Sequence, residues 1–223
     1  MRLFLDIETL PTEDPAVREE IAAGITPPGN MSKADTIAAW EVDKKPALVD
    51  EALRKTSFDA TFGRVCCIGW AFEDAPVATV MTPAMSEDDM LRSFCDTVLK
   101  QSAGQHEFRL EVIGHNVSWD LRFLLQRCIV HGIRPPTTLL AVMGAKPWSD
   151  SIRDTMLMWN PEREKRIKLD TLCKVLGVPT SKGDMDGSKV WDAYQAGEFE
   201  KIATYCAADV EATRAVFRRL SFL

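Results

Sequence analysis

The sequence predicts a single α/β domain in which a mixed sheet is covered by helices on both faces. Three observations support this fold class. Residues 3–8 alternate with the period of two that is typical of a strand, residues 65–72 form an apolar run, and later segments carry apolar residues at helical spacing. With 223 residues, the chain is long enough for one large domain or for one domain with an insertion.

The composition is that of a globular protein with a full core, since 46% of the residues are hydrophobic and 27% are charged. This composition excludes disordered and collagen-like chains. The longest apolar run, residues 65–72, is too short to span a membrane, and Asp6 follows the amino terminus too closely for a secretory signal. We therefore expect a cytoplasmic protein. Its six cysteines include no C-x-x-C pair, so we expect them to be core residues rather than zinc ligands.

The net charge of -6 argues weakly against nucleic-acid binding by bulk electrostatics. The distribution of charge is uneven, however. Residues 163–189 contain seven basic and four acidic side chains, whereas residues 10–60 contain ten acidic and six basic ones. A local basic surface therefore remains compatible with the sequence.

The amino-terminal third predicts three strands and one excursion. In residues 3–8, the period of two puts Asp6 and Glu8 on the same face of the first strand. Residues 10–60 contain proline, glycine and charge clusters, and we interpret them as an insertion or surface excursion with short helical pieces. Residues 65–72 then predict a buried strand, which a turn at Ala75-Pro76 connects to a strand over 77–81.

The central part predicts two helices separated by a short strand. Ser86 and Asp89 resemble a capping box, and apolar residues recur at helical spacing as far as Leu99. Residues 110–113 predict a strand that Gly114-His115-Asn116 ends. We expect Ser118 to cap the next helix, which ends at Gly132 and carries Asp120 in its first turn.

The carboxyl-terminal part is predicted to be mainly helical. Residues 154–159 are compatible with a further strand, and residues 169–176 predict a helix closed by Gly177. Residues 181–188 predict a glycine-containing loop. The last helix is expected from about Glu198 to Leu220.

Several acidic residues are candidates for metal binding. Asp6 and Glu8 interrupt an apolar strand on one face, where carboxylates are costly unless a divalent cation neutralises them. Asp120 belongs to a helix that follows a strand, so its first turn points toward the carboxyl edge of a parallel sheet. Tyr205 and Asp209 are four residues apart and lie on one side of the last helix. Taken alone, each residue also fits a solvated surface or a helix dipole.

Together, these residues form three motifs, Asp-Ile-Glu at 6–8, Gly-His-Asn-Val-Ser-Trp-Asp at 114–120 and Tyr-Cys-Ala-Ala-Asp at 205–209. They resemble the exonuclease motifs of the DEDD superfamily in its tyrosine branch, since Thr204 stands where the histidine branch has histidine. The chain is also similar to predicted 3′–5′ exonucleases related to the proofreading domain of family B DNA polymerases. This similarity includes the stretches at 62–69, 169–173 and 182–188.

This resemblance implies a ribonuclease H-like fold with a five-stranded mixed sheet, and it implies Asp6, Glu8, Asp120, Tyr205 and Asp209 as catalytic residues. The four carboxylates would hold two divalent cations, and oxygen-rich sites favour Mg²⁺ or Mn²⁺. By resemblance, Asp6, Glu8 and Asp209 would hold the ion that activates water, and Asp6 with Asp120 the ion at the leaving oxygen. Tyr205 would orient the attacking water.

Four further residues are candidates for substrate binding, namely Thr9, Leu10, Asn116 and Lys182. Leu10 could wedge against the terminal base or belong to the core. Asn116 could bind a ligand or cap a helix, and we favour the cap. Lys182 could contact phosphate or lie on a solvated basic face.

We therefore expect residues 1–223 to form a single 3′–5′ exonuclease domain with an insertion at about 10–60. It would hydrolyse single-stranded or frayed nucleic acid from a free 3′ end by a two-metal-ion mechanism. An endonuclease of the ribonuclease H type is the first alternative, although the position of Tyr205 argues against it. A catalytically silent nucleic-acid-binding domain of the same fold is the second. The choice between DNA and RNA and any protein partner stay open.

Overall fold

The computed structural model describes residues 1–103, 109–162, 166–181 and 183–223. The chain divides into two compact units. The larger unit comprises Met1–Glu8 and Val65–Leu223, and the smaller unit comprises Thr9–Arg64. The larger unit contains all the catalytic residues that the sequence predicts.

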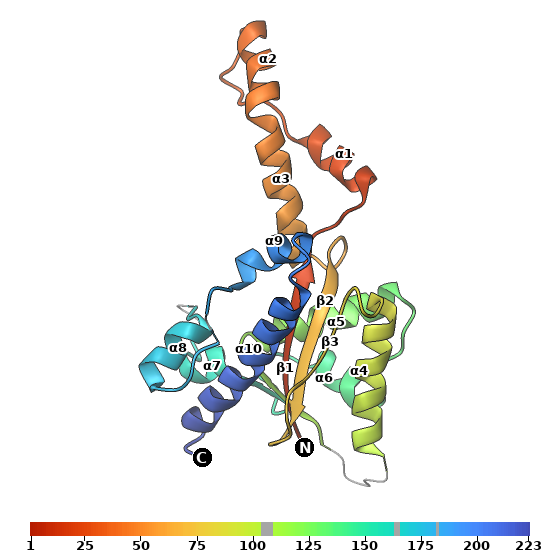
Figure 1. Cartoon of the computed structure of the whole chain (residues 1–223), viewed down its shortest axis with the longest axis vertical. Helices are drawn as coiled ribbons and strands as arrows, with labels where there is room; N and C mark the ends of the chain where they lie inside the picture. Colours follow the sequence, from red (N-terminus) through yellow and green to blue (C-terminus); the bar gives the residue numbers. More distant parts are fainter. Residues whose placement is uncertain (104–108, 163–165, 182) are drawn as a thin grey trace. The chain divides into compact units, whose positions relative to one another are not determined.

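The larger unit is built on a five-stranded sheet with the strand order β3-β2-β1-β4-β5 (Figure 1). The strands are β1 (Arg2–Leu10), β2 (Arg64–Phe72), β3 (Ala78–Met81), β4 (Glu111–Gly114) and β5 (Ile152–Asp154). β2 and β3 are antiparallel, whereas β1 is parallel to β4 and β4 is parallel to β5. The mixed five-stranded sheet, the strand over 65–72 and its hairpin are therefore confirmed.

Helices flank the sheet, and their bounds are α4 (Glu87–Ser102), α5 (Val117–Val130), α6 (Thr137–Met143), α7 (Thr155–Trp159), α8 (Leu169–Leu176), α9 (Val190–Gln195) and α10 (Phe199–Leu220). In Figure 1, α10 crosses in front of the strands and α5 lies behind them. α10 covers one face of the sheet because its Val210 and Phe217 pack against Phe4, Ala71 and Ile113. The last helix and the helix over 169–176, which ends at Gly177 with φ of 65°, are confirmed.

A partly buried ion-pair network joins β2, α4 and α5. The Glu87 carboxylate accepts hydrogen bonds from Arg127 Nε at 2.9 Å, Arg127 Nη2 at 2.7 Å and the backbone N–H of Val65 at 2.7 Å, and it lies 2.8 Å from His131 Nε2. Burial alone would raise the pKa of Glu87, but these hydrogen bonds hold it below its ordinary value. Ser86 begins α4 by accepting from Asp89 N at 3.1 Å, as the sequence predicts.

The predicted start of α5 is wrong by two residues. Asn116 rather than Ser118 occupies the N-cap position, in a left-handed conformation with φ of 63°. Its side chain makes no capping hydrogen bond, so the cap interpretation of this side chain is also wrong. The turn is stabilised instead from another strand, because Asp154 Oδ1 accepts from Asn116 N at 2.9 Å.

The strand predicted over residues 154–159 is wrong as well. β5 ends at Asp154, and residues 155–159 form the short helix α7. Asp154 caps this helix by accepting from Met156 N at 3.0 Å. A short apolar run fits a strand and a buried helix equally well, so its period could not distinguish them.

The smaller unit is helical, with α1 (Pro15–Gly24), α2 (Ala34–Asp43), α3 (Lys45–Lys55) and the single turn η1 (Thr56–Phe58). Trp40, Val49 and Leu53 are its buried side chains on α2 and α3. The short helical pieces predicted within 10–60 are therefore confirmed. None of the helices in the described part of the chain has both the length and the apolar composition that a membrane crossing needs.

Gly69 on β2 lets α10 approach the sheet. A Cβ atom at this position would lie 2.8 Å from Cys206 Sγ and 3.2 Å from Val210 Cγ2, and both of those side chains are fully buried. Cys206 is three residues before Asp209, so this close approach helps to set the height of Asp209 above the sheet.

We expect Gly69→Ala to lower the free energy of unfolding by about 1–3 kcal/mol, because overpacking forces a buried neighbour to shift. Urea unfolding monitored by circular dichroism measures this change. Gly24→Ala is the matched control, since a Cβ there meets nothing within 4 Å. Equal unfolding free energies for Gly69→Ala and the parent protein would contradict the packing argument.

Candidate active site

Three carboxylates converge where α10 crosses β1. Asp6 and Glu8 lie on β1, Asp209 lies on α10, and one carboxylate oxygen from each lies within 4.8 Å of the others. The period of two in β1 accounts for the first pair, since residues 6 and 8 point to the same face of the sheet. Residues separated by about 200 positions in the sequence thus form one acidic group.

Asp120 reaches the same region from α5 but is not a member of this three-carboxylate group. Its Oδ1 accepts a hydrogen bond from Ile7 N at 3.2 Å, between Asp6 and Glu8 in the chain. The parallel pairing of β1 with β4 explains this approach, because the helix after β4 begins beside the carboxyl end of β1. Asp120 is close enough to Asp6 for its charge to raise the pKa of Asp6.

The carboxylates destabilise one another's charged forms. Burial raises the pKa of Asp6 well above its ordinary value, and the charges of Glu8 and Asp209 raise it further. The pKa of Glu8 is raised by burial and by Asp209. Burial also raises the pKa of Asp120, although the hydrogen bond from Ile7 N opposes this shift. These carboxyl groups therefore favour their protonated forms until a cation neutralises them.

The residues present fit a divalent cation. Asp6 Oδ2 is buried and has no hydrogen-bond partner among the described residues, which is costly unless something else satisfies it. The converging donors are all carboxylate oxygens, which suit hard ions such as Mg²⁺ and Mn²⁺. A cation held by Asp6, Glu8 and Asp209 would remove the repulsion and satisfy the buried oxygen together.

Tyr205 precedes Asp209 by one helical turn, and its hydroxyl hydrogen-bonds the Asp209 carboxylate. Burial, followed by the charges of Asp209 and Glu8, raises the pKa of the phenol far above its ordinary value. The hydroxyl therefore stays protonated at neutral pH. It can donate and accept hydrogen bonds, but it cannot act as a general base.

Two cysteines lie directly behind the carboxylates. Cys206 Sγ donates to the carbonyl oxygen of Asp6 at 3.6 Å, and Cys206 and Cys67 hydrogen-bond each other. This hydrogen bond and burial raise the pKa of Cys206. Both thiols are fully buried, as the core role predicted for the cysteines requires.

His115 is a residue of this region whose contacts the sequence did not predict. Its Nε2 lies 2.8 Å from the carbonyl oxygen of Ile167, and its Nδ1 lies 2.9 Å from Thr155 Oγ1. Burial lowers the pKa of His115, so the ring is neutral at pH 7. The ring thereby connects the end of β4 to the start of α7 and to the chain before α8. In the sequence, the only indication that His115 belongs to the site is its position between Gly114 and Asn116.

A cavity of about 720 Å³ opens over the carboxylates. Asp6, Tyr205 and Asp209 line one side of it. The remaining lining comes mainly from the segments before and after α8 and includes Arg166, Ile167, Lys168, Leu169, Asp170, Ser181, Asp186, Gly187 and Ser188. The cavity is thus large enough for a nucleotide and gives it access to the acidic group.

The candidate substrate-binding residues have different surroundings. Asn116 lines the cavity. Thr9 Oγ1 donates to the carbonyl oxygen of Ser57 at 2.7 Å, and the side chain of Leu10 is fully buried, as a core residue is. Lys182 lies outside the described residues. The substrate roles of these four residues stay predictions.

Comparison with known proteins assigns the fold to a family. Residues 58–223 match the family model described as a predicted 3′–5′ exonuclease related to the exonuclease domain of PolB. The match includes Asp120, Tyr205 and Asp209, while Asp6 and Glu8 precede it. None of the curated proteins matches the chain significantly.

We expect Asp6→Asn to stabilise the metal-free protein, because it removes a buried charge while keeping the shape of the side chain. The raised pKa values of Asp6 and Glu8 mean that the folded state binds more protons than the unfolded state at pH values above about 4. The stability of the metal-free parent should therefore fall as pH rises through the raised pKa values. Asp6→Asn should lose less stability over the same range.

Thermal unfolding in EDTA at several pH values measures this difference. Mn²⁺ at 100 times its dissociation constant should then stabilise the parent by about 2.7 kcal/mol and the variant much less. A variant that melts below the parent in EDTA, or that gains equally from Mn²⁺, would contradict the assignment.

Proposed function

The chain belongs to the family of predicted 3′–5′ exonucleases related to the exonuclease domain of PolB, and from this premise we propose that it removes nucleotides from the 3′ end of single-stranded or frayed nucleic acid. The reaction would depend on two divalent cations, Mg²⁺ or Mn²⁺. Residues 1–223 would act as one exonuclease domain, with residues 10–60 as an excursion from it.

One observation carries this proposal. Asp6, Glu8 and Asp209 offer oxygens within 4.8 Å of one another, and the buried Asp6 Oδ2 has no other partner in the described part of the chain. A purely structural carboxylate group would be expected to carry Arg or Lys partners. Tyr205 gives the proposal further support, because its neutral phenol lies beside the carboxylate of Asp209.

In this proposal, Asp6, Glu8 and Asp209 would hold one cation, and Asp6 with Asp120 would hold the other. The chemistry that such cations supply when bound is neutralisation of the phosphodiester charge and activation of the attacking water. The hydrogen bond from Ile7 N fixes Asp120 against β1, so its other oxygen, Oδ2, is oriented by the sheet itself.

Tyr205 would orient the attacking water rather than deprotonate it. Its proton is held toward Asp209, so the lone pairs of its oxygen can accept a hydrogen bond from that water. The oxygen of the water then attacks phosphorus on the side opposite the leaving 3′ oxygen. The bond from phosphorus to that oxygen breaks, the attacking water gives up one proton to the solvent, and the leaving oxygen takes one up. The products are a nucleoside 5′-monophosphate and a strand with a new 3′ hydroxyl.

The decisive experiment follows product lengths over time on a single strand labelled at the 5′ end and on the same strand labelled at the 3′ end. With Mg²⁺ or Mn²⁺, we expect a ladder of one-nucleotide steps from the 5′ label and immediate release of a mononucleotide from the 3′ label. EDTA should abolish both. Internal fragments would favour the endonuclease alternative, and binding without hydrolysis would favour a silent domain.

We expect Tyr205→Phe to lower the rate of the chemical step by about 10²–10⁴-fold while the strand still binds, because only the orienting hydroxyl is lost. Asp209→Asn should be more damaging, since it removes a proposed metal ligand. Single-turnover cleavage at saturating enzyme isolates the chemical step. If Tyr205→Phe cleaves at the parent rate there, the phenol is only a packing residue.

A further inference from the structure

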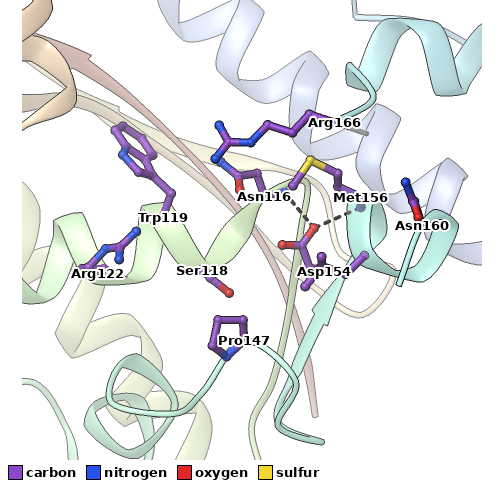
Figure 2. Close-up of a pocket in the computed structure, with 10 residues that line it drawn as sticks. Asn116, Ser118, Trp119, Arg122, Pro147, Asp154, Met156, Asn160 and Arg166 are labelled. Carbon is purple, nitrogen blue, oxygen red and sulfur yellow. Dashed lines mark hydrogen bonds between the residues drawn. The ribbon is translucent and has the colours of Figure 1, made fainter. Parts of the chain in front are cut away.

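A second cavity adjoins the one over the carboxylates. Its volume is about 310 Å³, and it shares Asn116, Met156 and Arg166 with the active-site cavity. Figure 2 shows Trp119 and Arg122 on α5 at one side of this second cavity and Met156 on α7 at the other. The two cavities are therefore neighbours, and α5 and α7 form the walls of the second.

A third cavity adjoins the second. Its volume is about 480 Å³, and it shares Pro147, Asp154 and Leu157 with the second. Trp148 also lines it. The shared residues connect each cavity to the next, from the cavity lined by Asp6 and Asp209 to the one lined by Trp148. We call the second and third cavities together the upstream track.

The charged groups of the upstream track suit a polyanion. Arg122 and Arg166 are exposed and form no ion pair within the described ranges of the chain, so their charges face the solvent. Arg153, in contrast, is paired with Glu111 at 2.7 Å. Asp154 is only 3% exposed, and its Oδ1 already accepts two backbone N–H groups, so it presents little negative charge to a ligand.

The aromatic and apolar groups suit exposed bases. The Trp148 side chain is 70% exposed, and the ammonium group of Lys146 lies 5.5 Å from the centre of its ring. Pro147, Met156 and Leu157 supply apolar surface between this ring and the active site. Aromatic faces together with cations are the features by which proteins hold single strands without reading their sequence.

We propose that the upstream track binds the part of a single strand that lies on the 5′ side of the scissile bond. This inference rests on the proposed function, which puts the 3′ end in the active-site cavity. A base then stacks on Trp148, and Arg122 and Arg166 contact phosphates. The interior bases of a duplex cannot bind in this way, because each is paired and is held between its stacked neighbours.

The test measures binding of oligonucleotides in EDTA, where no hydrolysis is expected, by fluorescence anisotropy. The probes are a trinucleotide, a nonanucleotide and the nonanucleotide annealed to its complement as a blunt duplex, each with a 5′ fluorophore. We expect the nonanucleotide to bind more tightly than the trinucleotide and the duplex. For Trp148→Ala, the ratio of the affinity for the nonanucleotide to the affinity for the trinucleotide should fall about tenfold.

Arg122→Gln should weaken binding of the nonanucleotide and reduce the slope of log affinity against log salt by about one. Trp159→Ala and Arg134→Gln are the matched controls, because both side chains are exposed and neither lines the track. Both controls should retain the affinities of the parent.

Three outcomes would refute the upstream track. The trinucleotide or the duplex could bind as tightly as the nonanucleotide, or Trp148→Ala could leave the ratio of nonanucleotide to trinucleotide affinity unchanged. None of these measurements requires catalysis. If the protein degrades strands from the 3′ end but its strand affinity does not depend on Trp148, the proposed function stands and the upstream track is refuted. If the protein binds strands through Trp148 but never hydrolyses them, the upstream track stands and the proposed function is refuted.

Discussion

Three like-charged carboxylates held within 4.8 Å of one another are the constraint on which the rest of the site depends. Their repulsion and burial oppose folding of the metal-free chain, so the surrounding structure must hold them in position. β1 holds Asp6 and Glu8 through its place in the middle of the sheet, and α10 is brought close by Gly69. The hydrogen bond from Ile7 to Asp120 fixes the remaining carboxylate against the same strand.

Parallel pairing of β1 with β4 is what makes this arrangement possible. Because the two strands point the same way, the turn after β4 begins beside Asp6, and the first turn of α5 carries Asp120 there. An antiparallel neighbour would have sent the following helix to the opposite edge. Position in the fold, rather than any local property of Asp120, therefore distinguishes it from an ordinary first-turn acid.

The sequence could predict those features that local periodicity encodes. A period of two puts Asp6 and Glu8 on one face, and a spacing of four does the same for Tyr205 and Asp209. The start of α5 could not be predicted in this way. Asn116 adopts a positive φ that depends on a hydrogen bond to Asp154, 38 residues later, and α7 depends on the same carboxylate. Contacts between residues so far apart in the sequence leave no periodic pattern in it. A short apolar run such as 154–159 fits a strand and a buried helix equally well.

Asp154 consequently has a structural importance that its sequence context conceals. One carboxylate ends β5, begins α7 and holds the turn from which α5 starts toward the active site. That turn also carries Asn116, which lines both the active-site cavity and the cavity beside it. His115, one residue earlier, connects the same turn to Thr155 and Ile167. The turn at residues 114–116 therefore supports Asp120 and also forms part of the wall of both cavities. The position of this proposed metal ligand and the shape of the proposed substrate path thus depend on the same few hydrogen bonds.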